Sequence, residues 1–232
     1  FFKNFKRITK LKMIKRKNII KVAIDSPAAA GAGTLAKTIS KHYKLFYLDT
    51  GKIYRFIAYL KIKYPKKFGQ SFIKLKIKNL KINDLSNNKL LSEEVSTEAS
   101  IISRNKNIRK LVHSFQLNYA YNPPKKYKGS CLDGRDITYK IVPDAEFKFY
   151  ITANVKTRAM RRFRELKALK KKVTFKEVLK SIKKRDKSDF SRKISPLRKT
   201  KDSLLINTTN LNKRSCFLKI KKIIDEKINI NG

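Results

Sequence analysis

The feature that most constrains this chain is a strand, a loop of small residues and a helix in direct succession. Residues 19–25 read IIKVAID, an apolar run of strand length, and the next stretch, SPAAAGAGT, consists almost entirely of small side chains. Leu35 and Ile39 then repeat at helical spacing in LAKTISKHY. In this context backbone N–H groups converge at a helix N-terminus and can bind phosphate. The segment therefore predicts an α/β fold with a candidate phosphate loop over residues 26–34.

The candidate loop departs from the usual phosphate-loop pattern, G-x-x-x-x-G-K-[ST]. Ser26 stands at the first glycine position and Ala32 at the lysine position, whereas Gly31 keeps the second glycine and Thr34 supplies a hydroxyl. The next lysine, Lys37, lies further along the helix, and we expect it to point away from the helix N-terminus. Taken alone, this window fits both a phosphate loop and an ordinary tight turn between strand and helix.

The rest of the chain alternates strands with helices. Strand patterns recur within residues 45–60, 128–136, 147–154 and 202–211, and each leads into a polar turn. Strands alternating with helices indicate crossover units on a mostly parallel sheet, which binds ligands at the carboxyl ends of its strands. Residues 64–91 differ, because Lys alternates there with Ile and Leu. A period of two predicts strands with one wet face, so we expect a small β-rich insertion.

Composition narrows the functional classes. The 232 residues include 59 Lys and Arg against 17 Asp and Glu, a formal net charge of +42. Such a charge favours anionic ligands, but the accompanying Ile and Asn are what an AT-biased coding sequence would produce, so nucleic-acid binding is not the expected main role. Cys131 and Cys216 have no disulfide-framework or metal-site spacing, and no run approaches the ~20 apolar residues of a membrane span. We expect a reduced, cytoplasmic monomer without a membrane partner.

Three stretches carry the strongest functional signal. They are AIDSPAAAGAGTLAK with YLDTGKIYR (residues 23–37 and 47–55), LDGRDITYKIVPDAEFKFYITANVKTRAMRRF (132–163), and KKRDKSDFSRKISPL with INTTNL (183–197 and 206–211). Together they resemble the bacterial cytidylate (CMP/dCMP) kinases, a family of P-loop nucleoside monophosphate kinases. The resemblance covers essentially the whole chain after residue 20, and the DGRD…VPDA and RD-x-x-D-x-x-R patterns are its most specific parts.

The resemblance implies a three-layer P-loop fold with a parallel five-stranded sheet and the transfer of phosphate from ATP to CMP or dCMP. It divides the chain into a basic N-terminal extension (1–18) and a single domain (19–232), in which residues 55–125 form the NMP-binding insertion and 156–195 the lid. Arginine suits such chemistry because its guanidinium grips phosphate bidentately and stays charged. The residues implied to bind CMP are Thr50, Tyr54, Arg55, Ser100, Arg109, Arg135, Asp136, Arg185, Asp189 and Arg192.

The donor side follows from the same resemblance. ATP would lie on the loop formed by Ser26, Pro27, Ala28, Ala29, Ala30, Gly31, Ala32, Gly33 and Thr34. Arg158 and Arg162, spaced i, i+4 on one helix face, resemble the lid over the ATP phosphates, and with Arg185 and Asp133 they are the implied catalytic residues. Asp133 and Thr34 are the implied Mg²⁺ ligands, directly or through water.

Ala32 keeps more than one functional interpretation open. Another cation, such as Arg158, Arg162 or a lid lysine, can supply the missing charge in a working kinase. The main alternative is a nucleotide-binding relative with little or no kinase activity. A basic RNA-binding protein is the third possibility, and it requires nucleic-acid affinity with a steep salt dependence that CMP and ATP do not compete.

Overall fold

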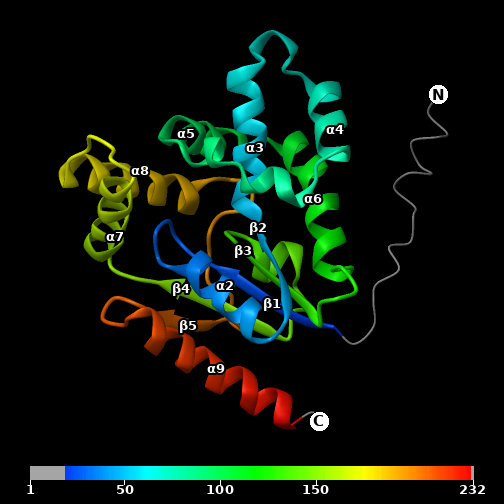
Figure 1. The fold of residues 1–232 in the computed structure, drawn as a ribbon, viewed down its shortest axis with the longest axis vertical. Helices are drawn as coiled ribbons and strands as arrows, with labels where there is room; N and C mark the ends of the chain where they lie inside the picture. Colours follow the sequence, from blue (N-terminus) through cyan, green and yellow to red (C-terminus); the bar gives the residue numbers. More distant parts are fainter. Residues whose placement is uncertain (1–18, 231–232) are drawn as a thin grey trace, which may run out of the picture.

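A parallel five-stranded sheet forms the centre of the molecule (Figure 1). A computed structural model describes residues 19–230, so the expected extension over residues 1–18 lies outside the described residues. The strands are β1 (Ile20–Asp25), β2 (Leu45–Asp49), β3 (Gly129–Gly134), β4 (Phe147–Thr152) and β5 (Leu204–Asn207). Their order is β2-β3-β1-β4-β5, and all neighbouring pairs are parallel. The predicted α/β fold with a parallel five-stranded sheet is confirmed.

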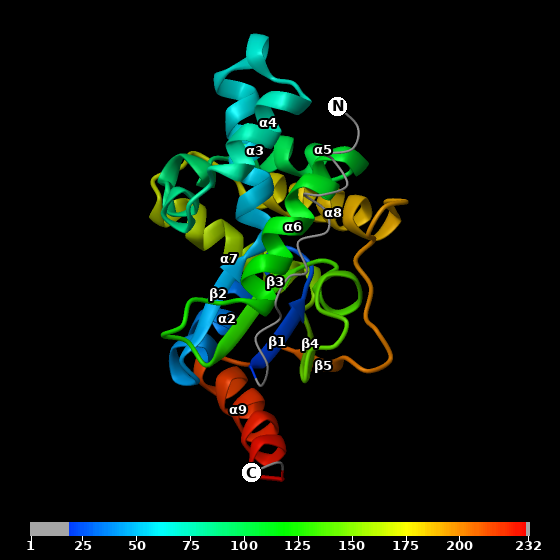
Figure 2. The same cartoon turned by 90° about the vertical axis from the view of Figure 1, so that its right-hand side faces the viewer.

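Helices cover both faces of the sheet, as the alternation of strands and helices requires. On one face, Val22 and Ile24 of β1 pack with α2 (Ala32–His42) and α9 (Lys213–Ile230). On the other, Ala23 packs with α3 (Thr50–Lys63) and α6 (Lys106–Tyr121). In Figures 1 and 2, α9 is seen below the sheet and α3 and α6 above it. Successive strand residues point to opposite faces, so one short strand contributes to both cores.

The predicted β-rich insertion is wrong, because the described residues 64–91 are helical. They form α4 (Gln70–Lys78) and three 3₁₀ turns, Pro65–Lys67, Ile82–Ser86 and Asn88–Leu91. Ile73, Ile77 and Leu80 are buried at spacings of four and three, whereas Leu75, which alternates with Ile73 and Ile77, is 56% exposed. An apolar pair at i, i+4 satisfies both a strand period and a helix period. Packing of one face against α6 decides for the helix.

A further pair of helices lies beside the phosphate loop. α7 (Val155–Ala168) packs on α8 (Phe175–Ser191), and their shared apolar cluster includes Ala28 of the loop. A reciprocal capping box between Thr174 and Glu177 starts α8. α5 (Glu93–Ile102) packs on α3, and a π-helical turn, Ile137–Ile141, follows β3. The division into an insertion over 55–125 and a lid over 156–195 stays a prediction.

Candidate functional site

The donor side of the candidate site is the loop between β1 and α2. The backbone reverses there through two left-handed residues, Ala29 with φ 59° and Gly31 with φ 90°. Glycine adopts this conformation without the Cβ penalty that Ala29 carries. In the first turn of α2, the N–H groups of Ala32, Gly33 and Thr34 have no hydrogen-bond acceptor among the described residues. Unpaired N–H groups at the positive end of a helix dipole form an anion-binding site.

Arg158 ties this loop to the helices beside it. Its Nη1 donates to the Ala28 carbonyl at 3.1 Å, and its Nε donates to the Ala153 carbonyl at 2.9 Å. Two further hydrogen bonds, of 2.9 and 2.6 Å, join it to both carboxylate oxygens of Asp186 on α8. Arg158 is therefore a buried structural link between the loop and α8. Its expected contact with the ATP phosphates stays a prediction.

Arg162, the other expected lid arginine, faces a different partner. Its guanidinium lies 3.0 Å from Glu165 on the same helix and 3.4 Å from Glu93 on α5. Both glutamates are well exposed, so water screens these ion pairs and they contribute little to stability. Arg162 thus connects α7 to α5 through its contact with Glu93.

Arg161 is a residue at this loop that the sequence patterns did not single out. Its Nη1 lies 3.8 Å from the point where a Cβ on Gly31 would stand. The guanidinium also donates to Thr208, in the turn after β5, at 2.9 Å to Oγ1 and 2.6 Å to the carbonyl. Thr208 in turn donates to the Ala30 carbonyl at 3.0 Å. The available signal was the INTTNL motif, whose polar turn follows a strand end, although no local pattern connects it to α7.

The acceptor side begins at the DGRD turn after β3. Asp25, fully buried, accepts hydrogen bonds from Ile137 N at 2.8 Å and from Thr138 N and Oγ1 at 2.9 and 2.6 Å. Burial raises the Asp25 pKa to about 6, although these hydrogen bonds partly offset the effect. The clamp fixes the turn that carries Arg135 and Asp136. One buried carboxylate therefore links the start of the donor loop to the acceptor residues.

Asp136 forms a buried ion pair with Arg109 of α6, and each side chain is less than a tenth exposed. Arg109 also donates to the Ser103 carbonyl at 3.1 Å, and its guanidinium carbon lies 5.4 Å from the centre of the Tyr54 ring. The Tyr54 hydroxyl is buried without a hydrogen-bond partner among the described residues. Buried polar groups are normally paired, so this hydroxyl is open to a polar ligand.

Asp189 of α8 lies among three guanidinium groups. It contacts Arg135 Nε at 2.8 Å, Arg192 Nη1 at 3.7 Å and Arg185 Nε at 4.0 Å. Burial opposes ionisation of Asp189, but the three positive charges outweigh it and lower its pKa. Arg185 and Asp189 lie at i, i+4 on one face of α8, Arg192 follows directly after the helix, and Asp189 joins them to Arg135 of the DGRD turn.

The acceptor cluster has more positive than negative charge. Arg185 has only the Ser96 hydroxyl at 3.1 Å as a hydrogen-bond partner, and its Nε has none among the described residues. Burial lowers the pKa of both Arg185, to about 10, and Arg55. The only hydrogen bond that the structure gives Arg55 is a long one of 3.4 Å to the Leu90 carbonyl. The cluster contains five arginines, Arg55, Arg109, Arg135, Arg185 and Arg192. Within residues 19–230, their ion-pair partners are limited to Asp136 and Asp189.

Asp133 lies between the two halves, at the end of β3. It accepts a hydrogen bond from the Tyr47 hydroxyl at 3.0 Å, and its Oδ2 lies 3.5 Å from the point where a Cβ on Gly33 would stand. Burial and the neighbouring Asp49 raise the Asp133 pKa to about 8. A carboxylate that is costly to ionise is stabilised by a bound cation. No group of three or more His, Cys, Asp or Glu side chains suitable for a metal occurs among the described residues.

The other predicted site residues fall into two groups. Thr50 donates from Oγ1 to the Asp133 carbonyl at 2.8 Å, and Ser26 donates from its backbone N to the Gly134 carbonyl at 3.2 Å, so both are buried where the two halves meet. Ser100 and Thr34 are more peripheral. The Ser100 carbonyl accepts from Ser103 Oγ, and the Thr34 side chain is exposed at the start of α2.

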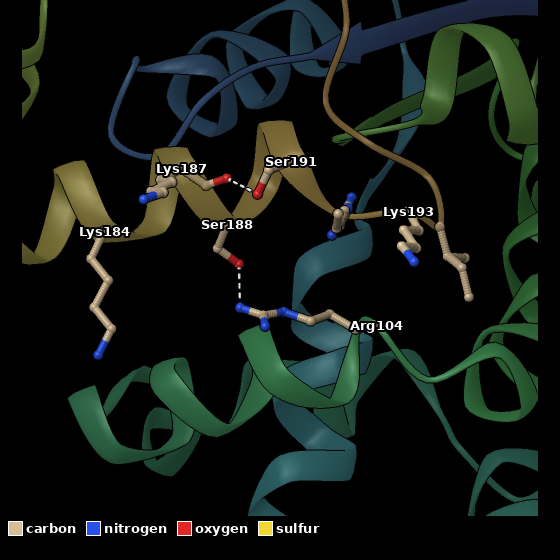
Figure 3. Close-up of a pocket in the computed structure, with 8 residues that line it drawn as sticks. Arg104, Lys184, Lys187, Ser188, Ser191 and Lys193 are labelled. Carbon is tan, nitrogen blue, oxygen red and sulfur yellow. Dashed lines mark hydrogen bonds between the residues drawn. The ribbon is translucent and has the colours of Figure 1, made fainter.

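A basic cavity of about 500 Å³ lies next to the acceptor cluster (Figure 3). Arg104, from the connection between α5 and α6, donates to Ser188 Oγ on α8 at 2.6 Å, and this hydrogen bond crosses the cavity. Arg192 belongs to both the cavity and the acceptor cluster, and lysines at 184, 187 and 193 line the remainder. No carboxylate lines this cavity, so its charge attracts anions toward the site.

Comparison with known proteins identifies the family. A protein-family model described as Cytidylate kinase matches residues 22–226. The chain belongs to the cytidylate kinase family. This confirms the resemblance drawn from the three sequence stretches.

Curated relatives agree with this family assignment. The chain is 40% identical to the Cytidylate kinase of Bartonella tribocorum over 205 residues, which cover 88% of this chain and 94% of that protein. It is 40% identical over 222 residues to that of Clostridium tetani, with 89% and 94% covered. Against that of Mesomycoplasma hyopneumoniae (strain 7448) it is 33% identical over 225 residues, with 90% and 95% covered.

A solved structure supports the fold of this cytidylate kinase family member. An uncharacterized protein from Eubacterium ventriosum superposes with a TM-score of 0.52, covering 89% of this chain and 98% of that one, at 17% sequence identity. Across residues 19–230, no helix is long and apolar enough to cross a membrane.

Proposed function

We propose that this chain transfers the γ-phosphoryl group of ATP to CMP or dCMP, giving the diphosphate. The observation that carries the proposal is the pair of unlike half-sites at the carboxyl ends of neighbouring strands. Unpaired N–H groups of the α2 N-terminus follow β1, and the turn after β3 carries Arg135 and Asp136, around which the arginine-rich cluster with two carboxylates assembles. A polyphosphate suits the first half, and a phosphate monoester with a hydrogen-bonding base suits the second.

The acceptor cluster matches the two ends of CMP. Cytosine presents an amine donor beside two acceptors, and carboxylates accept from that amine. We assign this role to Asp136 and Asp189, with Arg185 donating to the base acceptors, and their position in one cluster supports the assignment. Arg55, Arg109 and Arg192 are then available to the acceptor phosphate. A phosphate monoester would offset the excess positive charge of the cluster, and the base acceptors would pair the unsatisfied Arg185 Nε.

The donor residues suit phosphoryl transfer, in which positioning and charge neutralisation do most of the work. The first-turn N–H groups of α2 orient the donor phosphates. Arg162 on α7, whose ion pairs with two exposed glutamates are weak, is a further cation that can bind these phosphates. ATP supplies the transferred group, and Mg²⁺ offsets the charge on its oxygens. Asp133 and Thr34 are the residues that would hold the ion. With so few protein ligands, the ion would keep waters and phosphate oxygens in its shell, as Mg²⁺ commonly does.

In the reaction, an acceptor phosphate oxygen bonds to the γ-phosphorus while the bond from that phosphorus to the bridging oxygen breaks, releasing ADP. The attacking oxygen is already anionic, so the step requires no strong general base. The residues instead hold two anions together in one site and exclude water, because an open site would hydrolyse ATP. We further propose that the protein works as a cytoplasmic monomer, and its buried free cysteines, Cys131 and Cys216, fit a reducing compartment.

A coupled assay with ATP, Mg²⁺ and CMP, dCMP or UMP tests this function. We expect turnover with CMP and dCMP, and much less with UMP. The alternative that the alanine at position 32 raised is a nucleotide-binding relative with little kinase activity, and the cytidylate kinase family match does not favour it. CMP binding without turnover above the control lacking enzyme would establish that alternative and refute the kinase proposal.

A further inference from the structure

The phosphate loop has no cation of its own. Ala32 is the first residue of α2 and is 4% exposed, so a methyl group occupies the position where the usual pattern has lysine. The next lysine, Lys37, is exposed, and its Nζ lies 6.0 Å from the centre of the Tyr47 ring. Lys37 therefore extends along the side of the helix and does not replace the missing charge at the N-terminus.

Arg161 brings a guanidinium to this loop from a distant part of the chain. Its Nη1 lies 3.8 Å from the Cβ position on Gly31 and 3.4 Å from the Ala30 carbonyl. The two hydrogen bonds to Thr208, which follows the carboxyl end of β5, hold the same group. Thr208 is 3% exposed and also donates a hydrogen bond to the Ala30 carbonyl of the loop. These contacts hold the Arg161 guanidinium in a fixed position beside the phosphate loop.

The ion pairs of α7 distinguish Arg161 from its neighbours. Arg158 is neutralised by Asp186, and Arg162 lies near Glu93 and Glu165. Arg161 has no carboxylate within ion-pair distance anywhere in the described part of the chain, and its acceptors are neutral carbonyls and a hydroxyl. A guanidinium has five N–H groups, so these three hydrogen bonds leave two to donate. An uncompensated, half-buried cation with free donors is suited to binding an anion.

We propose that Arg161 is the donor-phosphate cation of this protein and compensates for alanine at position 32. The proposal rests on the proposed function, since it assigns Arg161 to the polyphosphate on the same loop. Its two remaining N–H groups donate to phosphate oxygens, while Thr208 and Ala30 hold the other edge of the guanidinium. Arginine suits this role because it stays charged and can bind phosphate through parallel hydrogen bonds.

Binding of ADP and of adenosine to the full chain separates phosphate contact from base contact. Calorimetry on Arg161→Met should show ADP binding weakened by roughly tenfold to a hundredfold, the range for a charge-assisted hydrogen bond, and adenosine binding within about twofold of wild type. Arg161→Lys, which keeps the charge, should lose less than Arg161→Met. Arg164→Met is the matched control, because Arg164 is exposed on the same helix, and it should bind ADP like wild type. Circular dichroism checks that every variant is folded.

A second comparison asks whether charge at the loop is what Arg161 supplies. In the Arg161→Met background, adding Ala32→Lys should recover much of the lost ADP affinity and of the CMP-dependent turnover. Wild-type ADP affinity in Arg161→Met would overturn the proposal. So would equal losses of ADP and adenosine, or a folded double variant no tighter than Arg161→Met. If wild type lacks turnover with CMP, the proposed function fails, but the ADP comparison still decides the role of Arg161.

Discussion

Arg185 should be a residue whose removal makes the nucleotide-free protein more stable and the nucleotide complex weaker. Its Nε is buried without a partner among the described residues, and its nearest ion-pair contact is Asp189 at 4.0 Å. Burial lowers its pKa from 12.5 to about 10. Because the group is charged in both the folded and unfolded states at neutral pH, the protein carries this unfavourable energy at every pH below about 10.

The size of the effect follows from the pKa and the exposure. A fall in pKa from 12.5 to about 10 corresponds to roughly 3–4 kcal/mol, at about 1.4 kcal/mol per pKa unit. Since 30% of the side chain is exposed, solvent screening reduces this to about 1–2 kcal/mol. Arg185→Met also loses the bond to Ser96, whose hydroxyl can turn to a carbonyl of its own helix. We therefore expect the free energy of unfolding to rise by about 1 kcal/mol.

Urea unfolding with and without CMP measures both halves of the prediction. Arg185→Met should unfold at higher urea than wild type without nucleotide, and saturating CMP should stabilise it less than wild type. Arg164→Met is the control, because its exposed side chain on α7 should change stability by less than about 0.5 kcal/mol. A variant less stable than wild type in the absence of CMP would refute the electrostatic argument. An undiminished CMP effect would show that Arg185 does not contact the acceptor.

Three further perturbations test other parts of the site. Asp189→Asn should raise the KM for CMP about tenfold while changing that for UMP much less, since a carboxylate accepts from the cytosine amine; equal losses in steady-state assays would contradict base reading. Arg158→Met should lower the free energy of unfolding by about 3–5 kcal/mol, because it leaves Asp186 unpaired beside the loop, and a loss below 1 kcal/mol in urea unfolding would show that the pair is screened. The pKa of Asp25 is raised to about 6 from 3.8, so the folded state holds that proton more tightly than the unfolded state. The stability of wild type relative to Asp25→Asn should therefore fall as pH rises from about 4 to 6 and level off above it, and a flat difference in urea unfolding across this range would contradict it.

The sequence predicted the site best where functional residues follow strand ends. Asp25, Asp49 and Asp133 each end a strand, and parallel strands bring those ends to one edge of the sheet. The same argument places Thr208, after β5, at that edge, although its partner on α7 could not be predicted. The prediction of strands for residues 64–91 was wrong for a local reason, since the spacing of the apolar residues there fits both a strand period and a helix period.

Local pattern thus determined the order of strands and helices, the loop that lacks its lysine, and the stretches that carry the acceptor residues. These depend on residues close together in the chain, whose spacing fixes which face or end of an element they occupy. Local spacing accounts for pairs such as Arg162 with Glu165, whereas tertiary structure decided the contacts of Arg158 and Arg161. Arg158 meets Asp186, and Arg161 meets Thr208 and Ala30, across long separations in sequence. Whether a cation is neutralised or free for a ligand depends on such contacts, and no periodicity in the chain encodes them.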